Sequence, residues 1–197
     1  MVWDDTFATT PVGRDEPIEL VGTYLRLTGI VNLGRFGRLS DLINASSGYV
    51  RIRDARLLRR NGDATKMMLP ELMVDQDEIS FIAQTEAPAP EPGAAVGFIE
   101  PAFGAEIEAR KPRQFVMFTP GHAVTGKVHV FGETDLAGFV DSTDPRFVAV
   151  TDVTTRSLAD TRVVSHYPFV VINRTQMIAA SEIGRDGDIR AEDVPDL

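Results

Sequence analysis

Apolar and polar residues alternate along several short stretches of this chain, which is the pattern of half-buried β-strands. In each half of the chain, a short segment among these stretches carries apolar residues at i, i+3 and i+4, which is one face of a helix too short to be stable alone. Each half therefore predicts four strands and one short helix. The predicted strands are 23–33, 49–58, 69–74 and 79–83, then 122–131, 147–153, 167–173 and 177–181.

The two halves match each other position by position. Aligning Gly29 with Gly126 pairs Leu39 with Leu136, and after one added residue Asp54 pairs with Asp152. Self-similarity at a fixed period indicates a repeated structural unit. We therefore expect a mainly β (α+β) protein of two tandem small β-rich barrel-like domains, each with one short helix, related by internal duplication.

This alignment and the local composition divide the chain into five parts. We expect a flexible N-terminal arm at 1–18, a first repeat at 19–85, a Pro/Ala/Glu-rich linker at 86–113, a second repeat at 114–182 and an acidic tail at 183–197. The linker contains an apolar segment that either packs on a domain or binds a partner. Large aromatic and aliphatic side chains dominate the energetics of interfaces. The candidate partner-binding residues are therefore Phe98, Ile99 and Phe103 in the linker and Trp3 and Phe7 in the arm.

Charge and cysteine content narrow the class of protein. The net charge is −9, and residues 1–19 and 182–197 together supply −8 of it, so the repeats themselves are nearly neutral. The chain has no cysteine, which excludes disulfides and thiolate sites. It begins without a signal-peptide pattern and has no apolar run long enough to span a bilayer. We expect a cytoplasmic protein with no membrane partner.

The residue types of common active sites are sparse. There are three histidines, and none precedes His122. His122 and His129 are seven residues apart, which places them on opposite faces of a strand and prevents a shared metal. Asp54 and Asp152 close a predicted strand in each repeat, so they are either turn-capping residues or a paired acid site brought together across the repeats. We expect no catalytic residue, no metal and no cofactor.

The most unusual surface is basic. Five arginines fall within the ten residues from 51 to 60, on a predicted hairpin that turns at Asn61-Gly62. If Val50 and Ile52 face the core, Arg51 and Arg53 face outward together. Such a row either binds phosphates or is solvated and paired with nearby acids. The candidate polyanion-binding residues are Arg51, Arg53, Arg56, Arg59 and Arg60.

Two resemblances accompany this pattern. The segments "RLSDLIN" and "YVRIRDA" resemble an uncharacterised bacterial domain family with an R-L-S-D-L-L-N-like segment ahead of a strand ending in T-D-A, and the second repeat keeps the spacing as "DLAGFVD" and "FVAVTDV". That resemblance implies architecture only. The order of "DLIN", "RIRDA" and "VDQDEISFI" is also faintly similar to Sm-like RNA-binding barrels, with Asp75-Gln76 in place of their Arg-Gly turn.

These observations favour a non-enzymatic binding or assembly module of the bacterial cytoplasm. A protein partner or self-association is the favoured interaction. The alternative is a polyanion, either a nucleic acid or a phosphate ligand, bound through the arginine-rich hairpin.

Overall fold

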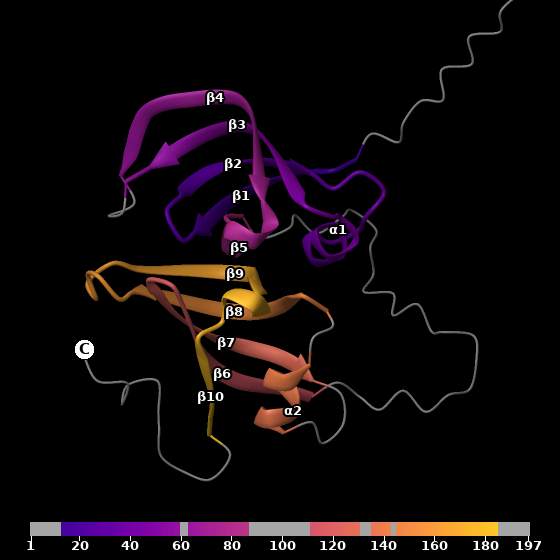
Figure 1. The fold of residues 1–197 in the computed structure, drawn as a ribbon, viewed down its shortest axis with the longest axis vertical. Helices are drawn as coiled ribbons and strands as arrows, with labels where there is room; N and C mark the ends of the chain where they lie inside the picture. Colours follow the sequence, from indigo (N-terminus) through magenta and orange to yellow (C-terminus); the bar gives the residue numbers. More distant parts are fainter. Residues whose placement is uncertain (1–12, 60–62, 87–110, 131–134, 143–144, 185–197) are drawn as a thin grey trace, which may run out of the picture.

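The computed structural model describes residues 13–59, 63–86, 111–130, 135–142 and 145–184 (Figure 1). The first half contains β1 (Asp15–Gly22), β2 (Arg26–Asn32), α1 (Leu39–Ala45), β3 (Tyr49–Leu58), β4 (Ala64–Asp75), the 3-10 turn η1 (Gln76–Glu78) and β5 (Ile79–Gln84). The second half contains β6 (Lys111–Thr119), β7 (His122–Val130), α2 (Leu136–Asp141), β8 (Phe147–Ser157), β9 (Val164–Asn173), η2 (Arg174–Gln176) and β10 (Ala179–Ile183).

All ten of these strands belong to one antiparallel sheet. Their order is β10-β6-β7-β8-β9-β5-β1-β2-β3-β4, so the strands of each half follow the same internal order and the halves meet where β9 pairs with β5. The mainly β class and the two short helices are confirmed. The expected pair of separate barrel-like domains is not confirmed, because the sheet is continuous across both halves and is not closed. No helix among the described residues is long and apolar enough to cross a membrane.

Each half interrupts its strand ladder at the same place. Asp54 has φ 50° and lies opposite Pro70, and neither residue is in the β3–β4 register. On the neighbouring strand, a Cβ on Gly29 would lie 2.5 Å from Ile52 Cγ2, so only glycine allows this close approach of β2 to β3. The second half has the same three residue types at Gly126, Asp152 and Pro168. The aspartates predicted to close strands thus lie inside β3 and β8, as bulge residues that redirect the strand.

The first strand of each half was not predicted. β1 begins at Asp15, inside the range assigned to the arm, and β6 begins at Lys111, inside the range assigned to the linker. β1 carries Glu16 and Glu19, which are buried and ion-paired with arginines. These charges, with Asp15 at its start, conceal a strand whose other residues are apolar.

The cores of the two halves share side chains where the halves meet. β5 is buried along its whole length. Phe81 of β5 belongs to the apolar cluster of the second half, whereas Phe147 and Val171 of the second half belong to the cluster of the first. The halves therefore form one packed body, stacked in Figure 1 with β5 and β9 at the centre.

Candidate functional site

The contact between the halves, which we call the joint, is built on β5 and β9. Four residue pairs align across it, from Phe81 opposite Ile172 to Gln84 opposite Phe169. Beside the strands, Asn44 at the end of α1 donates to Phe147 O and accepts from Phe147 N, both at 2.8 Å. One amide side chain therefore satisfies both backbone groups of the residue that begins β8, which fixes α1 against the second half.

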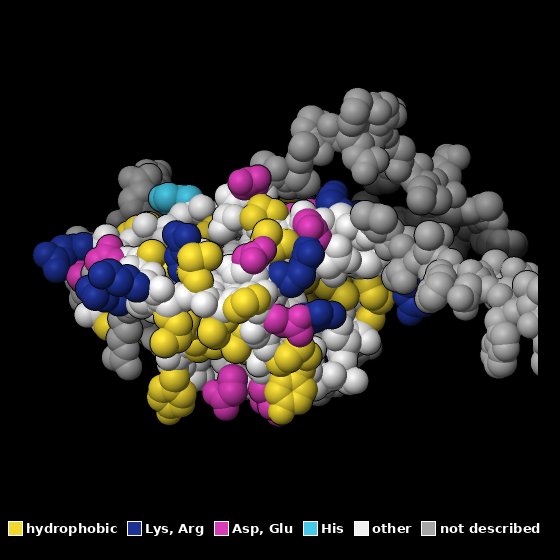
Figure 2. All heavy atoms as spheres, turned by 90° about the horizontal axis from the view of Figure 1, so that it is seen from above, with side chains coloured by type: hydrophobic (Ala, Val, Ile, Leu, Met, Phe, Trp, Pro, Cys, Tyr) yellow, Lys and Arg dark blue, Asp and Glu magenta, His cyan; other side chains and the backbone are white. Residues whose placement is uncertain are grey.

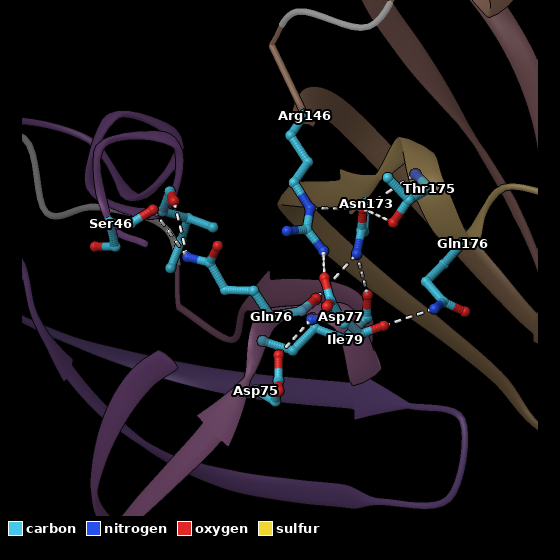
Figure 3. A network of polar contacts seen from close by, with 10 residues as sticks. Ser46, Asp75, Gln76, Asp77, Ile79, Arg146, Asn173, Thr175 and Gln176 are labelled. Atoms are coloured by element: carbon cyan, nitrogen blue, oxygen red, sulfur yellow. Dashed lines mark hydrogen bonds and ion pairs between the residues drawn. The ribbon is translucent and has the colours of Figure 1, made fainter. Parts of the chain in front are cut away.

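Polar side chains of the two 3-10 turns reinforce the joint (Figure 3). Asn173 donates to Gln76 O at 3.0 Å and to Ile79 O at 2.9 Å, while Gln176 donates to Asp77 O at 2.6 Å. The carboxylate of Asp77 also lies 2.5 Å from the Arg146 guanidinium. Backbone carbonyls in and beside the first 3-10 turn thus accept bonds across the joint, which specifies its register.

A buried titratable cluster lies on the β1–β9 side of the joint. Tyr167 donates to Glu19 at 2.8 Å, and Arg26 lies 2.5 Å from the same carboxylate. Burial, and then the negative charge of Glu19, raise the pKa of Tyr167 to about 12. Burial, followed by the charge of Arg26, lowers the pKa of His122, whose ring meets Phe81 edge-on at 5.5 Å.

This cluster has the residue types of an acid–base site, but its contacts are those of a packed core. The Glu19 carboxylate is satisfied by a phenol and a guanidinium, and none of these side chains lines the groove on β4 described below. His129 is exposed beside Thr151 on the opposite face of β7 from His122, as predicted. Within the part of the chain that the structure describes, no group of three His, Asp or Glu side chains could hold a metal ion.

Large apolar side chains are exposed at the β4 end of the sheet. We call the surface that they form the β4 edge surface. It consists of Met67, Met68 and Met73 of β4, Tyr49 at the start of β3 and Tyr24 in the β1–β2 turn. A shallow, mostly apolar groove of about 260 Å³ runs beside β4, between the β1–β2 turn and η1. Seen from this end of the molecule, apolar side chains spread over the surface, interspersed with Arg and Lys and with Asp and Glu side chains (Figure 2). The groove is lined by Leu20, Gly22, Tyr24, Leu25, Leu72, Met73, Val74, Asp75 and Glu78.

The β10 edge lies at the opposite end of the sheet. Among the described strands β10 pairs with β6 alone, and its residues are exposed or half-buried, in contrast to β5. Ile178, just before the strand, is 70 % exposed. A sheet edge with unpaired backbone groups is a template for another strand.

The structure tests only part of the sequence-predicted arginine row. Val50 and Ile52 are buried, which confirms that Arg51 and Arg53 point away from the core. Arg51 lies 2.5 Å from Glu71 and Arg53 lies 2.5 Å from Asp15, so both are ion-paired within the chain. Arg56 contacts Met68 and Arg59 is exposed, while Arg60 lies outside the described residues.

The five residues proposed to bind a partner also lie outside the described residues: Trp3, Phe7, Phe98, Ile99 and Phe103. The structure instead shows exposed apolar residues on the β4 edge surface, which the sequence did not predict as a binding site. Its signal was "KMMLPELM", which overlaps the predicted strand 69–74 and carries three methionines at positions that do not alternate with polar residues.

No protein-family model, curated protein or solved structure matches this chain.

Proposed function

We propose that this protein is a non-enzymatic binding or assembly module, built from two copies of one five-stranded unit, and that the β4 edge surface makes the contact. The support for a duplication is the common strand order and the bulge that recurs at matching residues. The support for a binding role is one observation above all. Three methionines of β4 are exposed at a sheet edge with which no other described strand pairs, and two exposed tyrosines, Tyr24 of the β1–β2 turn and Tyr49 of β3, accompany them.

Exposed apolar patches beside a groove mark sites of interaction with other proteins. Methionine suits such a surface because its flexible, polarisable side chain adapts to a partner. The side chains of the buried titratable cluster do not line this groove, whose lining is mostly apolar. A groove of that composition favours a binding contact.

Two methionines on the same strand provide an internal test. Met73 is 51 % exposed and Met68 is 57 % exposed, so both should oxidise at similar rates in the dilute purified protein. Met73 lines the groove and Met68 does not. Oxidative footprinting in extracts of the source cell should therefore show slower oxidation of Met73 relative to Met68. Equal protection of the two, or none, would refute a contact at the groove.

Polyanion binding through Arg51, Arg53, Arg56, Arg59 and Arg60 is the second candidate. The observation in its favour is that the Arg51 side chain remains 65 % exposed although it pairs with Glu71. Exposed ion pairs are weak, so a phosphate could compete for such an arginine. The salt dependence of binding to a nucleic acid would distinguish this candidate from an apolar contact.

A further inference from the structure

We propose that copies of this protein bind one another head to tail, with β4 of one copy adding to β10 of the next in the register that β9 and β5 adopt within the chain. The inference rests on the proposed function, since it names the partner of the β4 edge surface. Such a contact joins two different surfaces, so it can repeat until a ring closes or a filament grows.

The two sheet edges are the counterparts of the two strands at the joint. β4 holds the place in the first half that β9 holds in the second, and β10 corresponds in the same way to β5. In the alignment of the two halves, Met73 of the first half corresponds to Val171 of the second, and Ala180 of the second half corresponds to Ile82 of the first. Ile82 lies opposite Val171 at the joint. Ala180 therefore lies opposite Met73 in the proposed contact.

The backbone of β4 is oriented for this pairing. Gln76 donates its N–H to Gly48 O at 2.8 Å, so it points toward β3. Backbone groups of a strand alternate in direction, so the N–H and C=O groups of Met73 and Glu71 point away from β3, toward the unpaired edge. The same argument holds for Val171, because Arg174 donates its N–H to Arg146 O at 2.9 Å.

The backbone of β10 offers the complementary groups. Thr85, just after β5, donates its N–H to Pro17 O at 3.2 Å, which places the backbone groups of Ile82 toward β9. Ala180 is the counterpart of Ile82, and we infer from that correspondence that its backbone groups are directed away from β6, as those of Ile82 are directed away from β1. Both edges thus present backbone groups at the positions that pair in the joint.

Side chains at the β4 edge are exposed where their counterparts are buried. Phe147 and Val171 are 1 % and 0 % exposed at the joint, whereas Tyr49 and Met73 at the same positions are 57 % and 51 % exposed. Burying such apolar side chains stabilises a contact between two copies, against the cost of association. The difference identifies Tyr49 and Met73 as the apolar centre of the proposed interface.

The other edge has matching exposed residues. Val140 of α2 is 42 % exposed, while its counterpart Ile43 of α1 is 1 % exposed in the cluster that holds Phe147 and Val171. In the proposed contact, Val140 meets Tyr49 and Met73 of the next copy. Both partners therefore leave exposed the side chains that the joint buries.

A phenylalanine ring is carried by different strands at the joint and at the β10 edge. At the joint, Phe81 of β5 lies opposite Val21 of β1, and both pack into the apolar cluster of the second half. At the β10 edge, Ala179 lies opposite Phe118, so the strand that carries the ring is β6. The pair of positions holds one phenylalanine and one small residue in each case. Phe118 is the ring that enters the groove of the next copy.

The polar network of the joint is not reproduced in the proposed contact. Asn173 and Gln176 donate at the joint to backbone carbonyls in and beside the first 3-10 turn. Their counterparts Asp75 and Glu78, which line the groove, carry carboxylates that cannot donate such bonds. The positions of Arg146 and Asp77 are taken by Gly48 and Thr175, which cannot form that ion pair. The contact between copies is therefore weaker than the joint and depends on concentration.

The test uses the full chain and matched variants, with assembly followed by native mass spectrometry and sedimentation over a wide range of concentration. Met73→Asp should raise the Kd of self-association at least about tenfold, because it buries a charge at the centre of the contact. Met68→Asp is the control, since its counterpart His166 stays exposed beside the joint. Ala179→Glu, at an exposed position of β10, should weaken assembly as much as Met73→Asp.

Circular dichroism and thermal melting establish that each variant folds, and Ile178→Asp replaces Ala179→Glu if the latter does not. Three results would overturn the proposal. The first is an unaltered chain that stays monomeric at every concentration, which leaves the proposed function intact if Met73 is still protected in cell extracts. The second is that Met68→Asp weakens assembly as much as Met73→Asp. The third is that variants on β10 leave assembly unchanged, which would assign it to pairing of two β4 edges.

Discussion

The substitution Phe81→Ala tests whether the two halves form one cooperative body. Phe81 is fully buried, it comes from β5 of the first half, and it packs in the apolar cluster of the second. Removing a buried phenylalanine ring costs about 3–5 kcal/mol, and the lost edge-on contact with His122 is worth about 0.5–1.5 kcal/mol of such a total. The free energy of unfolding should therefore fall by about 3–5 kcal/mol.

The assay is equilibrium unfolding in urea, followed by far-ultraviolet circular dichroism. With an m value of about 2–3 kcal/mol/M, the midpoint should fall by about 1–2.5 M urea. Phe36→Ala is the control, because Phe36 is only partly buried beside Arg35, and its cost should stay below about 1 kcal/mol.

A second readout reports on the joint itself. Burial is the largest cause that lowers the pKa of His122, and the Phe81 ring supplies part of that burial. Phe81→Ala should therefore raise the pKa of His122 toward its ordinary value, as measured by NMR titration of the three histidines. A loss of less than about 1 kcal/mol together with an unchanged His122 pKa would refute the reasoning, since the ring would then not connect the halves.

Three further predictions test the bulge, the buried cluster and the arginine row. Gly29→Ala should destabilise the fold by about 1–3 kcal/mol in a thermal melt, because its Cβ would lie 2.5 Å from a buried side chain of β3. Gly37→Ala is the control, since its Cβ would meet no atom within 4 Å, and equal effects of the two changes would contradict the bulge argument. Tyr167→Phe should reduce the loss of folding stability above pH 10. Burial raises the pKa of Tyr167 to about 12, so the unfolded state releases this proton at lower pH than the folded state does. An alkaline unfolding curve that Tyr167→Phe leaves unchanged would be evidence against this. The double change Arg51→Glu and Arg53→Glu should abolish polyanion binding and reduce its salt slope if the second candidate function holds, and undiminished binding would exclude these arginines.

Local pattern was sufficient for much of the fold. β3 was predicted with its observed bounds, because Val50 and Ile52 alternate strictly with Arg51 and Arg53. α1 was predicted from Leu39 and Ile43, both of which are buried. The match between Asp54 and Asp152 was also visible, although their role was not, since a positive φ cannot be read from residue type alone.

The missing parts are those decided by contacts distant in sequence. Glu19 is buried in β1 because Tyr167 and Arg26 satisfy its carboxylate, and that partnership across the joint leaves no local signal. The pairing of β5 with β9 likewise joins residues about half the chain apart, so two independent domains were expected where one sheet exists. The β4 edge surface was missed for the same reason. An exposed strand edge is recognised only when the order of strands is known.

The most direct test of the central claim is to mix two edge variants and record the native mass spectrum of the mixture, with one variant labelled with ¹⁵N. Met73→Asp keeps an intact β10 edge, and Ala179→Glu keeps an intact β4 edge. Each variant alone should be monomeric, and the mixture should form a dimer that contains one copy of each and nothing larger, because only one complementary pair of edges remains. A mixture that stays monomeric, or in which one variant assembles with itself as the unaltered chain does, would contradict head-to-tail pairing of β4 with β10.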